Sequence, residues 1–183
     1  MVTAEKLMTA EDLLRLSGQG RYELVKGVLV KMTPPGYEHG ATTMRFAIRI
    51  ANHVSAHDLG EVVAAETGFR LARNPDTVRG ADVAFVSKAR QPAVAPAGYA
   101  DFAPDLVVEV VSPNDDPDEI QTKVAEWLEF GVRLVLIVYP RSRQVAVYRS
   151  LREVTILTEA DTFSAPEVLP GFTCPIAAIF ASA

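Results

Sequence analysis

The chain has 183 residues, of which 49% are hydrophobic and 22% charged, which is typical of one globular domain with a substantial core. The net charge of −5 argues against a protein that coats nucleic acid regardless of sequence, because such proteins are normally basic. A single cysteine, Cys174, excludes an internal disulfide framework and fits a reducing cytoplasm. No apolar segment approaches the roughly 20 residues that span a bilayer, so we expect a cytoplasmic protein without membrane association.

The first predicted elements are a short helix and a β-rich segment. Thr9 and Asp12 have the spacing of a capping box, which predicts a helix over residues 9–16. Residues 22–32 favour strands, and Gly27 marks a hairpin turn or a bulge between them.

The longest predicted helix covers residues 38–58. Gly60 lies just beyond it, where helices commonly end. Apolar residues at helical spacing should form its buried stripe: Met44, Ala47, Ile48, Ala51 and Val54.

Strands should follow this helix. Residues 61–65 and 68–71 look like a pair around a tight turn, and residues 81–86 form a further strand that begins with Asp82. Residues 91–103 are rich in proline and alanine and lack periodicity, so they predict a loop long enough to be functional.

Residues 104–116, PDLVVEVVSPNDD, hold one carboxylate, Glu109, inside a run of valine and leucine. Alternate strand residues point to opposite faces, so Glu109 shares its face with Val107 and Val111. Both faces are therefore apolar, which is typical of a strand covered on both sides. An isolated buried carboxylate is costly and either shifts its pKa or finds a cation.

The best-marked helix starts directly after this strand. Asp116 is the expected N-cap, Pro117 the first helical residue and Gly131 the stop. An apolar strand over 132–139 then completes a βαβ unit, or a helix laid across a mixed sheet. A hairpin over 144–148 and 154–157 and a docking segment over 171–180 end the chain. We therefore expect a single α/β domain over residues 1–183, with a mixed central sheet flanked by helices.

Three residues could form a site: Asp82, Glu109 and Lys123. Lys123 lies three residues after Ile120 and four before Trp127, at the margin of the helix's buried stripe. From that position its ammonium could reach back over the sheet.

Two carboxylates from adjacent strands would suit Mg²⁺, with an ammonium nearby to stabilise negative charge on a phosphate. Simpler structural interpretations exist for two of the three residues. Asp82 could cap a strand or turn, and Lys123 could pair with Glu119 on the helix surface.

Several motifs resemble one known family. They are YELVKGVLVKMTPPGYEHG (22–40), ADVAFV (81–86), PDLVVEVVSPNDD (104–116), Lys123 followed by WLEFGV (127–132), and LVLIVYP (134–140). Together they resemble the Uma-type restriction-endonuclease-like family, formerly a domain of unknown function, in the PD-(D/E)xK nuclease superfamily. The resemblance covers about Thr9 to Phe180, and the VVEVVSP run is its most specific part.

The resemblance implies that Asp82 and Glu109 bind Mg²⁺ or Mn²⁺ and that a lysine assists the attacking water. Ala81 stands where the superfamily usually has proline, and Val111 stands where it usually has that lysine. In this family the lysine is taken to lie on the following helix, which corresponds to Lys123.

Glu23 and His39 match further positions of the family. Glu23 could bind the metal or support its ligands, and His39 could contact a phosphate or a metal-bound water. Glu23 could equally lie on a strand surface, and His39 could simply begin a helix.

The resemblance implies an endonuclease that hydrolyses DNA phosphodiester bonds. We also expect a homodimer, because symmetric pairing through an edge strand would suit an enzyme that cuts a duplex. The alternative is a catalytically idle restriction-endonuclease-like fold that serves as a dimeric binding or regulatory module. A third interpretation is a metal-dependent phosphoesterase that acts on a small substrate.

Overall fold

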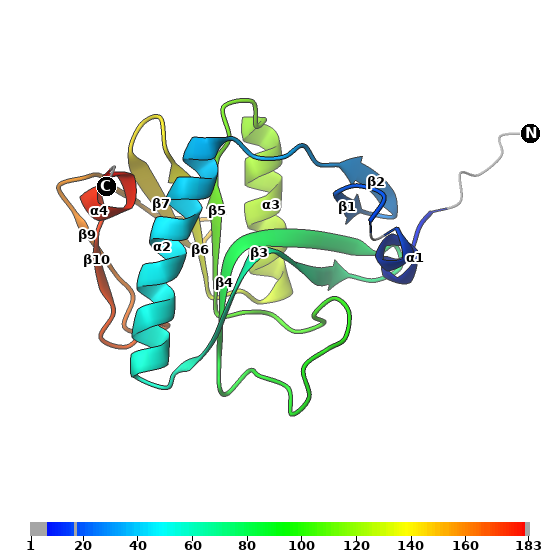
Figure 1. Ribbon diagram of the computed structural model, residues 1–183, viewed down its shortest axis with the longest axis horizontal. Helices are drawn as coiled ribbons and strands as arrows, with labels where there is room; N and C mark the ends of the chain where they lie inside the picture. The colour runs from blue at the N-terminus through cyan, green and yellow to red at the C-terminus, as the bar shows by residue number, and fades with distance from the viewer. Residues whose placement is uncertain (1–6, 17, 182–183) are drawn as a thin grey trace, which may run out of the picture.

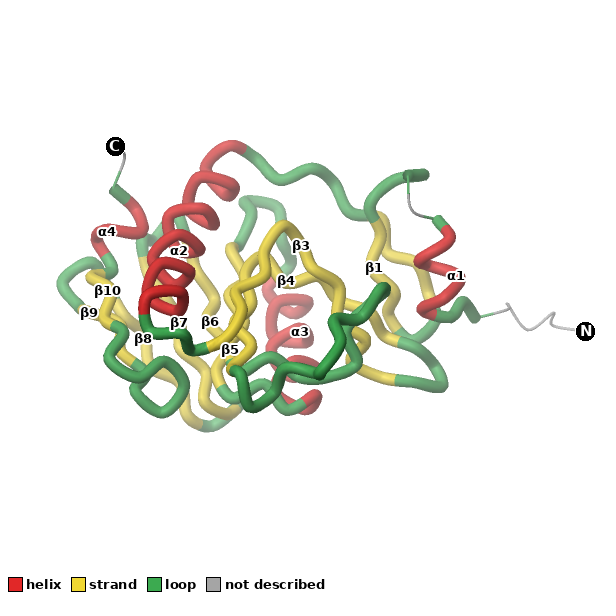
Figure 2. Tube along the Cα trace, turned by 60° about the horizontal axis from the view of Figure 1, so that its bottom comes forward, coloured by secondary structure: helices red, strands yellow, loops and turns green. Residues whose placement is uncertain are grey.

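The computed structural model describes residues 7–16 and 18–181; the rest of the predicted domain, residues 1–6, 17 and 182–183, lies outside that range. Its main sheet has the strand order β2-β1-β4-β5-β6-β7-β8, and β3 pairs with β4 beside this path. The long helices α2 (Tyr37–Ala56) and α3 (Pro117–Phe130) lie on opposite sides of the sheet (Figures 1 and 2). The α/β fold with a mixed sheet flanked by helices is thus confirmed.

The sheet consists of eight strands. They are β1 (Tyr22–Val25), β2 (Val28–Lys31), β3 (Gly60–Ala72), β4 (Thr77–Ser87), β5 (Leu106–Val110), β6 (Leu134–Tyr139), β7 (Gln144–Ser150) and β8 (Glu153–Leu157). Among the strands that the structure describes, β5 and β6 are the parallel pair, and α3 connects them, so the predicted βαβ unit is confirmed. The remaining elements are α1 (Ala10–Arg15), the paired short strands β9 (Thr162–Ser164) and β10 (Thr173–Pro175), and α4 (Ala177–Phe180).

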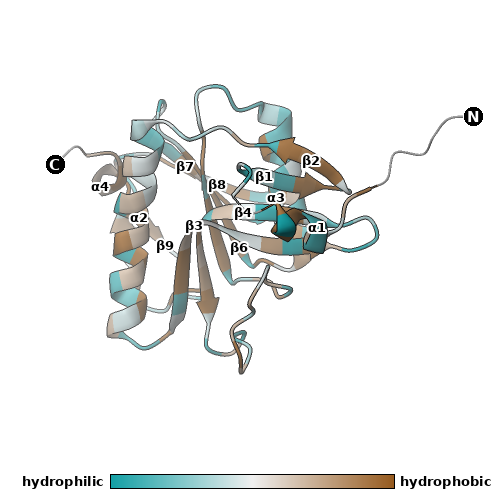
Figure 3. Ribbon diagram, turned by 45° about the vertical axis from the view of Figure 1, so that its right-hand side comes forward, coloured by the Kyte–Doolittle hydropathy of each residue, from teal (hydrophilic) through white to brown (hydrophobic). Residues whose placement is uncertain are grey.

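The central strands consist largely of hydrophobic residues, coloured brown in Figure 3, and apolar clusters lie on both faces of the sheet. On β5, Leu106 and Val108 pack toward α2, where Phe46 and Ile50 meet the C-terminal segment. Val107 packs on the other face with the α3 residues, including Trp127. The strand that carries Glu109 is therefore covered on both sides, as its sequence predicts.

The predicted ends of two helices are confirmed. Thr9 and Asp12 form the capping box of α1. The Asp116 side chain accepts a hydrogen bond from the amide of Asp118 at 2.8 Å and so caps α3. Gly131 ends α3 with φ 104°, a left-handed conformation that glycine adopts without the steric cost of a Cβ.

The predicted buried stripe of α2 is only partly right. Ala47 and Val54 are buried, but Met44 and Ile48 are 56% and 49% exposed. The helix instead buries Phe46 and Ile50 beside Ala47 and Val54. Phe46 has the larger apolar surface, and placing it in the core turns Met44 and Ile48 toward solvent.

The strand boundaries near Asp82 also differ from the prediction. Residues 61–65 and 68–71 are not two strands around a turn but parts of β3, interrupted by a bulge between Ala64 and Thr67. Ala65 has φ 56° there, which bends the strand without reversing it. β4 begins at Thr77, so Asp82 lies in the middle of the strand rather than at its start.

Asp105 fixes the point at which β5 enters the sheet. Its side chain is almost fully buried and accepts a hydrogen bond from the amide of Ser87 at 2.8 Å. The guanidinium groups of Arg90 and Arg133 lie 3.3 and 3.4 Å from its other oxygen. None of the described helices has the length and apolar character needed to cross a membrane.

We expect the substitution Asp105→Ala to lower the free energy of unfolding by about 2–4 kcal/mol, because it leaves the amide of Ser87 unpaired and removes a buried charge partner. Urea unfolding of both proteins measures the difference. Glu129→Ala removes an exposed carboxylate from α3 and should cost less than about 0.5 kcal/mol. Equal losses in the two variants would show that Asp105 has no special role.

Candidate active site

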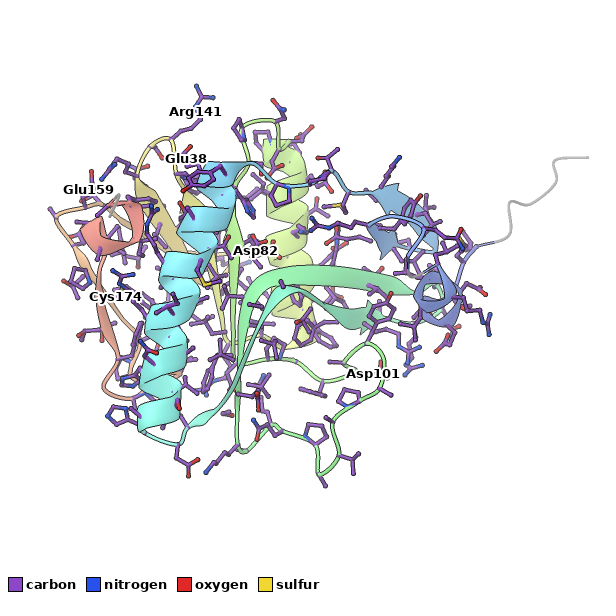
Figure 4. All side chains as sticks on the ribbon, viewed as in Figure 1. Glu38, Asp82, Asp101, Arg141, Glu159 and Cys174 are labelled. Atoms are coloured by element: carbon purple, nitrogen blue, oxygen red, sulfur yellow. The ribbon has the colours of Figure 1, made fainter. Side chains whose placement is uncertain are left out.

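Asp82 lies at the point where the paired strands β4 and β5 separate. The β4–β5 ladder ends at the pair Val83 and Val108. At the next position the Asp82 carboxylate accepts the amide hydrogen of Val110 at 2.7 Å, in place of a main-chain oxygen. The same oxygen lies 3.2 Å from Nε2 of His39, near the start of α2. Asp82 is therefore held between β5 and α2 (Figure 4).

Glu109 finds both of its partners on α3. Its Oε2 atom lies 3.2 Å from Nζ of Lys123, and its Oε1 atom accepts a hydrogen bond from Nε1 of Trp127 at 2.9 Å. Lys123 and Trp127 are four residues apart, so one face of the helix supplies both donors. Burial raises the pKa of Glu109 to about 7; Lys123 opposes this shift, and the charge of Asp82 adds to it.

Lys123 lies between two carboxylates. Its ammonium is 3.2 Å from Glu109 and 3.3 Å from Glu23 on β1. Burial disfavours the charged ammonium, but these two carboxylates outweigh it and raise the pKa of Lys123 above its ordinary value. The surface pair with Glu119 is not what holds Lys123, because Glu119 lies 3.6 Å from Arg79 instead.

Arg79 anchors this cluster from β4, and sequence reasoning missed it. Its guanidinium is almost fully buried and donates to Glu23 at 2.8 Å and to Glu126 of α3 at 2.7 Å. The amide of Gly80 donates to the other oxygen of Glu23 at 2.9 Å. The sequence does show an arginine three residues before Asp82 in a β-rich run. The predicted strand began at residue 81 and therefore did not include it.

Glu23 is buried in this network and does not lie on a strand surface. Burial alone would raise its pKa, but Lys123 and Arg79 lower it below its usual range. Its two carboxylate oxygens accept hydrogen bonds from Arg79 and Gly80 and lie near the ammonium of Lys123. Glu23 therefore helps to hold Lys123 in position.

His39 faces Asp82 and is mostly buried. Burial favours the neutral ring, but the hydrogen bond and charge of Asp82 and the charge of Asp115 raise the pKa of His39 above its ordinary value. Its Nδ1 atom is buried and has no hydrogen-bond partner within the part of the chain that the structure describes. One ring nitrogen is thus fixed while the other is unused.

Negative charge is in excess at this site. The carboxylates of Asp82, Glu23, Glu109 and Glu126 are largely buried, and they outnumber the neighbouring cationic groups Lys123, Arg79 and His39. Among the side chains that the structure describes, no three of His, Cys, Asp or Glu are grouped to hold a metal by themselves. Mg²⁺ commonly takes only one or two protein carboxylates and fills its shell with water and phosphate oxygens, so the donors present fit such an ion.

Two cavities are lined by His39. One, of about 490 Å³, lies where β5, β6, α2 and α3 begin or end, and Val111, Tyr139 and His39 line it. The other, of about 350 Å³, lies between α2 and the bulge of β3, and Asp82, His39 and Gly40 line it. His39 is shared by both, so the site opens on each side of this residue.

Comparisons with known proteins agree with this fold. No curated protein matches the chain. A solved structure from Anabaena variabilis, described as "a putative nuclease belonging to DUF820", is 18% identical with a TM-score of 0.81 over 94% of this chain and 97% of that one. A family model, Uma2, described as "Putative restriction endonuclease", matches residues 10–177. The chain therefore belongs to the Uma2 family.

Proposed function

We propose that this protein is a Mg²⁺- or Mn²⁺-dependent endonuclease that hydrolyses DNA phosphodiester bonds, with Asp82 and Glu109 as the metal ligands. The observation that carries the proposal is the excess of largely buried carboxylates, at Asp82, Glu109, Glu23 and Glu126, over the neighbouring cationic groups Lys123, Arg79 and His39. Uncompensated buried charge is expensive, and a divalent cation would offset it. The description of the Uma2 family supports the choice of nuclease chemistry.

The two proposed ligands are held from different directions. The amide of Val110 and the ring of His39 both contact Oδ2 of Asp82. Trp127 and Lys123 each take one oxygen of Glu109. Such an ion, when bound, would lower the pKa of a water molecule and offset negative charge on a phosphate.

Lys123 supplies the positive charge for the developing phosphorane. Glu23 and Glu109 keep the ammonium protonated and limit its movement, so it needs little reorganisation during the reaction. His39 holds the Asp82 carboxylate in place through its Nε2 atom, 3.2 Å away. Arg79 binds Glu23, and Glu23 contacts the ammonium of Lys123, so Arg79 helps to position Lys123 indirectly.

We expect Asp82→Ala, Glu109→Ala and Lys123→Ala each to lower the rate of plasmid nicking and of linear DNA cleavage in Mn²⁺ by about 10²-fold or more, because each removes a ligand or a charge from the transition state. Gel assays measure the rates, and thermal melting establishes that each variant is folded. Glu129→Gln on the exposed side of α3 should cut as fast as the wild type. Equal nicking by all of these proteins would contradict the assignment.

We also expect Mn²⁺ at about 100 times its dissociation constant to stabilise the wild type by about 2.7 kcal/mol, a rise in Tm of about 5–10 °C. Asp82→Asn and Glu109→Gln should abolish most of this rise, because each removes a charged ligand while keeping the side-chain shape. Melting curves with and without Mn²⁺ measure it.

The metal titration also separates the two main functions. A Tm that rises in wild type without any DNA cleavage would favour the idle binding module. Absence of any rise, in wild type and variants alike, would show that this carboxylate pair holds no metal.

A further inference from the structure

The buried guanidinium of Arg79 contacts three carboxylates. It donates to Glu126 at 2.7 Å and to Glu23 at 2.8 Å, and the carboxylate of Glu119 lies 3.6 Å away. The side chains of Arg79 and Glu126 are 2% and 17% exposed, so water and salt screen this pair only weakly. Glu119 and Glu126 both belong to α3, the helix that carries Lys123. Arg79 therefore joins strand β4 to the acidic side chains around Lys123.

Glu119 and Glu126 are placed to compete for the ammonium of Lys123. They stand four residues before and three residues after it in α3, and side chains at these spacings are neighbours on a helix surface. A glutamate four residues before a lysine is also the more favourable order of such a pair. The ammonium nevertheless lies 3.2 Å from Glu109 and 3.3 Å from Glu23. Local spacing along the helix thus does not explain where Lys123 points.

The contacts of Arg79 explain this preference. Because the guanidinium compensates the charges of Glu119 and Glu126, these two carboxylates attract the ammonium less strongly. Arg79 also takes the Oε2 atom of Glu23, while the Oε1 atom of Glu23 lies 3.3 Å from Nζ of Lys123. The two cations therefore use different oxygens of Glu23 and do not displace each other.

Arginine suits this role better than lysine does. Its guanidinium is a planar fork with five N–H donors and can bind two carboxylates at once, whereas an ammonium is a single point charge. Without the guanidinium, the largely buried Glu23 and Glu126 would lose a charge partner, and an uncompensated buried carboxylate is costly. Lys123 lies 3.3 Å from Glu23 and three residues from Glu126. Its flexible side chain would then be drawn toward these carboxylates and away from Glu109.

We propose that Arg79 is a positioning residue, which occupies the carboxylates that compete with Glu109 and so directs the ammonium of Lys123 to the reaction site. This inference rests on the proposed nuclease function and adds the residue that selects the position of its lysine. The effect of Arg79 on the reaction passes through Lys123. A change at Arg79 should therefore lower kcat and leave KM nearly unchanged.

The single tryptophan of the chain reports the position of Lys123 without a cleavage assay. Trp127 donates its indole hydrogen to Glu109 at 2.9 Å, so the NMR resonance of this hydrogen depends on the charge beside Glu109. In the metal-free protein, we expect the resonance of Arg79→Met to move from its wild-type position toward that of Lys123→Met, which lacks the ammonium. In Arg79→Met/Glu126→Gln one competing carboxylate is neutral, and the resonance should return most of the way.

Arg79→Met/Glu129→Gln is the matched control. It loses an exposed carboxylate from the same helix, so its net charge equals that of Arg79→Met/Glu126→Gln, and its resonance should stay where Arg79→Met places it. Melting curves establish that each variant is folded. If Arg79→Met does not fold, Arg79→Lys replaces it throughout, because it keeps the charge but cannot bind Glu23 and Glu126 together. The same displacement and the same return are then expected, at smaller size.

Cleavage of plasmid DNA in Mn²⁺ connects the position of Lys123 to the reaction. Arg79→Met should lower kcat by at least about tenfold, because the ammonium no longer faces the developing negative charge, while KM changes by less than about twofold. Adding Glu126→Gln should recover most of this loss, and adding Glu129→Gln should recover none of it.

The two measurements separate this inference from the proposed function. An indole resonance that keeps its wild-type position in the folded Arg79 variant would overturn the positioning role, whether or not the protein cuts DNA. A resonance that moves and returns as expected, with no cleavage by any of the proteins, would keep the positioning role and refute the nuclease. Equal recovery with Glu126→Gln and Glu129→Gln would show that only net charge matters, and the competition for Lys123 would be wrong.

Discussion

The burial of Glu109 in the central sheet is the constraint on which the rest of the site depends. A carboxylate between two apolar layers must be compensated, and α3 provides this with Lys123 and Trp127 on one face. The position of α3 is fixed in turn by its Asp116 cap, the left-handed Gly131 and the buried Trp127. Strand β5 with Glu109 and the crossover helix α3 with Lys123 are thus one structural unit.

The N-terminal hairpin joins this unit through charge as well as packing. Strand β1 meets β4 in register only at Leu24 and Val78. Next to that pair, Glu23 binds Arg79 from β4 and faces Lys123 from α3. Breaking such a buried pair would leave a charge uncompensated, so the hairpin, the sheet and α3 are held in one arrangement. Glu23 of the hairpin thus supports Lys123, which lies on helix α3 and not on the strand of Glu109.

Helix α2 serves two purposes with its two sides. Phe46 and Ile50 close the core on one face of the sheet. His39, near the N-terminal end, contacts Asp82. On the opposite side of the helix, Met44 and Ile48 are exposed to solvent.

The sequence alone determined the βαβ unit, the helix caps, the doubly covered strand and the anomaly of Glu109, because capping and alternation depend on neighbours in the chain. It also singled out Asp82 and Lys123 as candidates. Only the tertiary structure decided that Lys123 meets Glu109 and Glu23, that Asp82 replaces a main-chain partner of Val110, and that Arg79 is buried. These contacts join residues 14 to 100 positions apart or depend on where strands separate, and local patterns carry no information about such distances. The exposed stripe of α2 was misassigned for the same reason: which of two apolar faces is buried depends on the sheet that the helix covers.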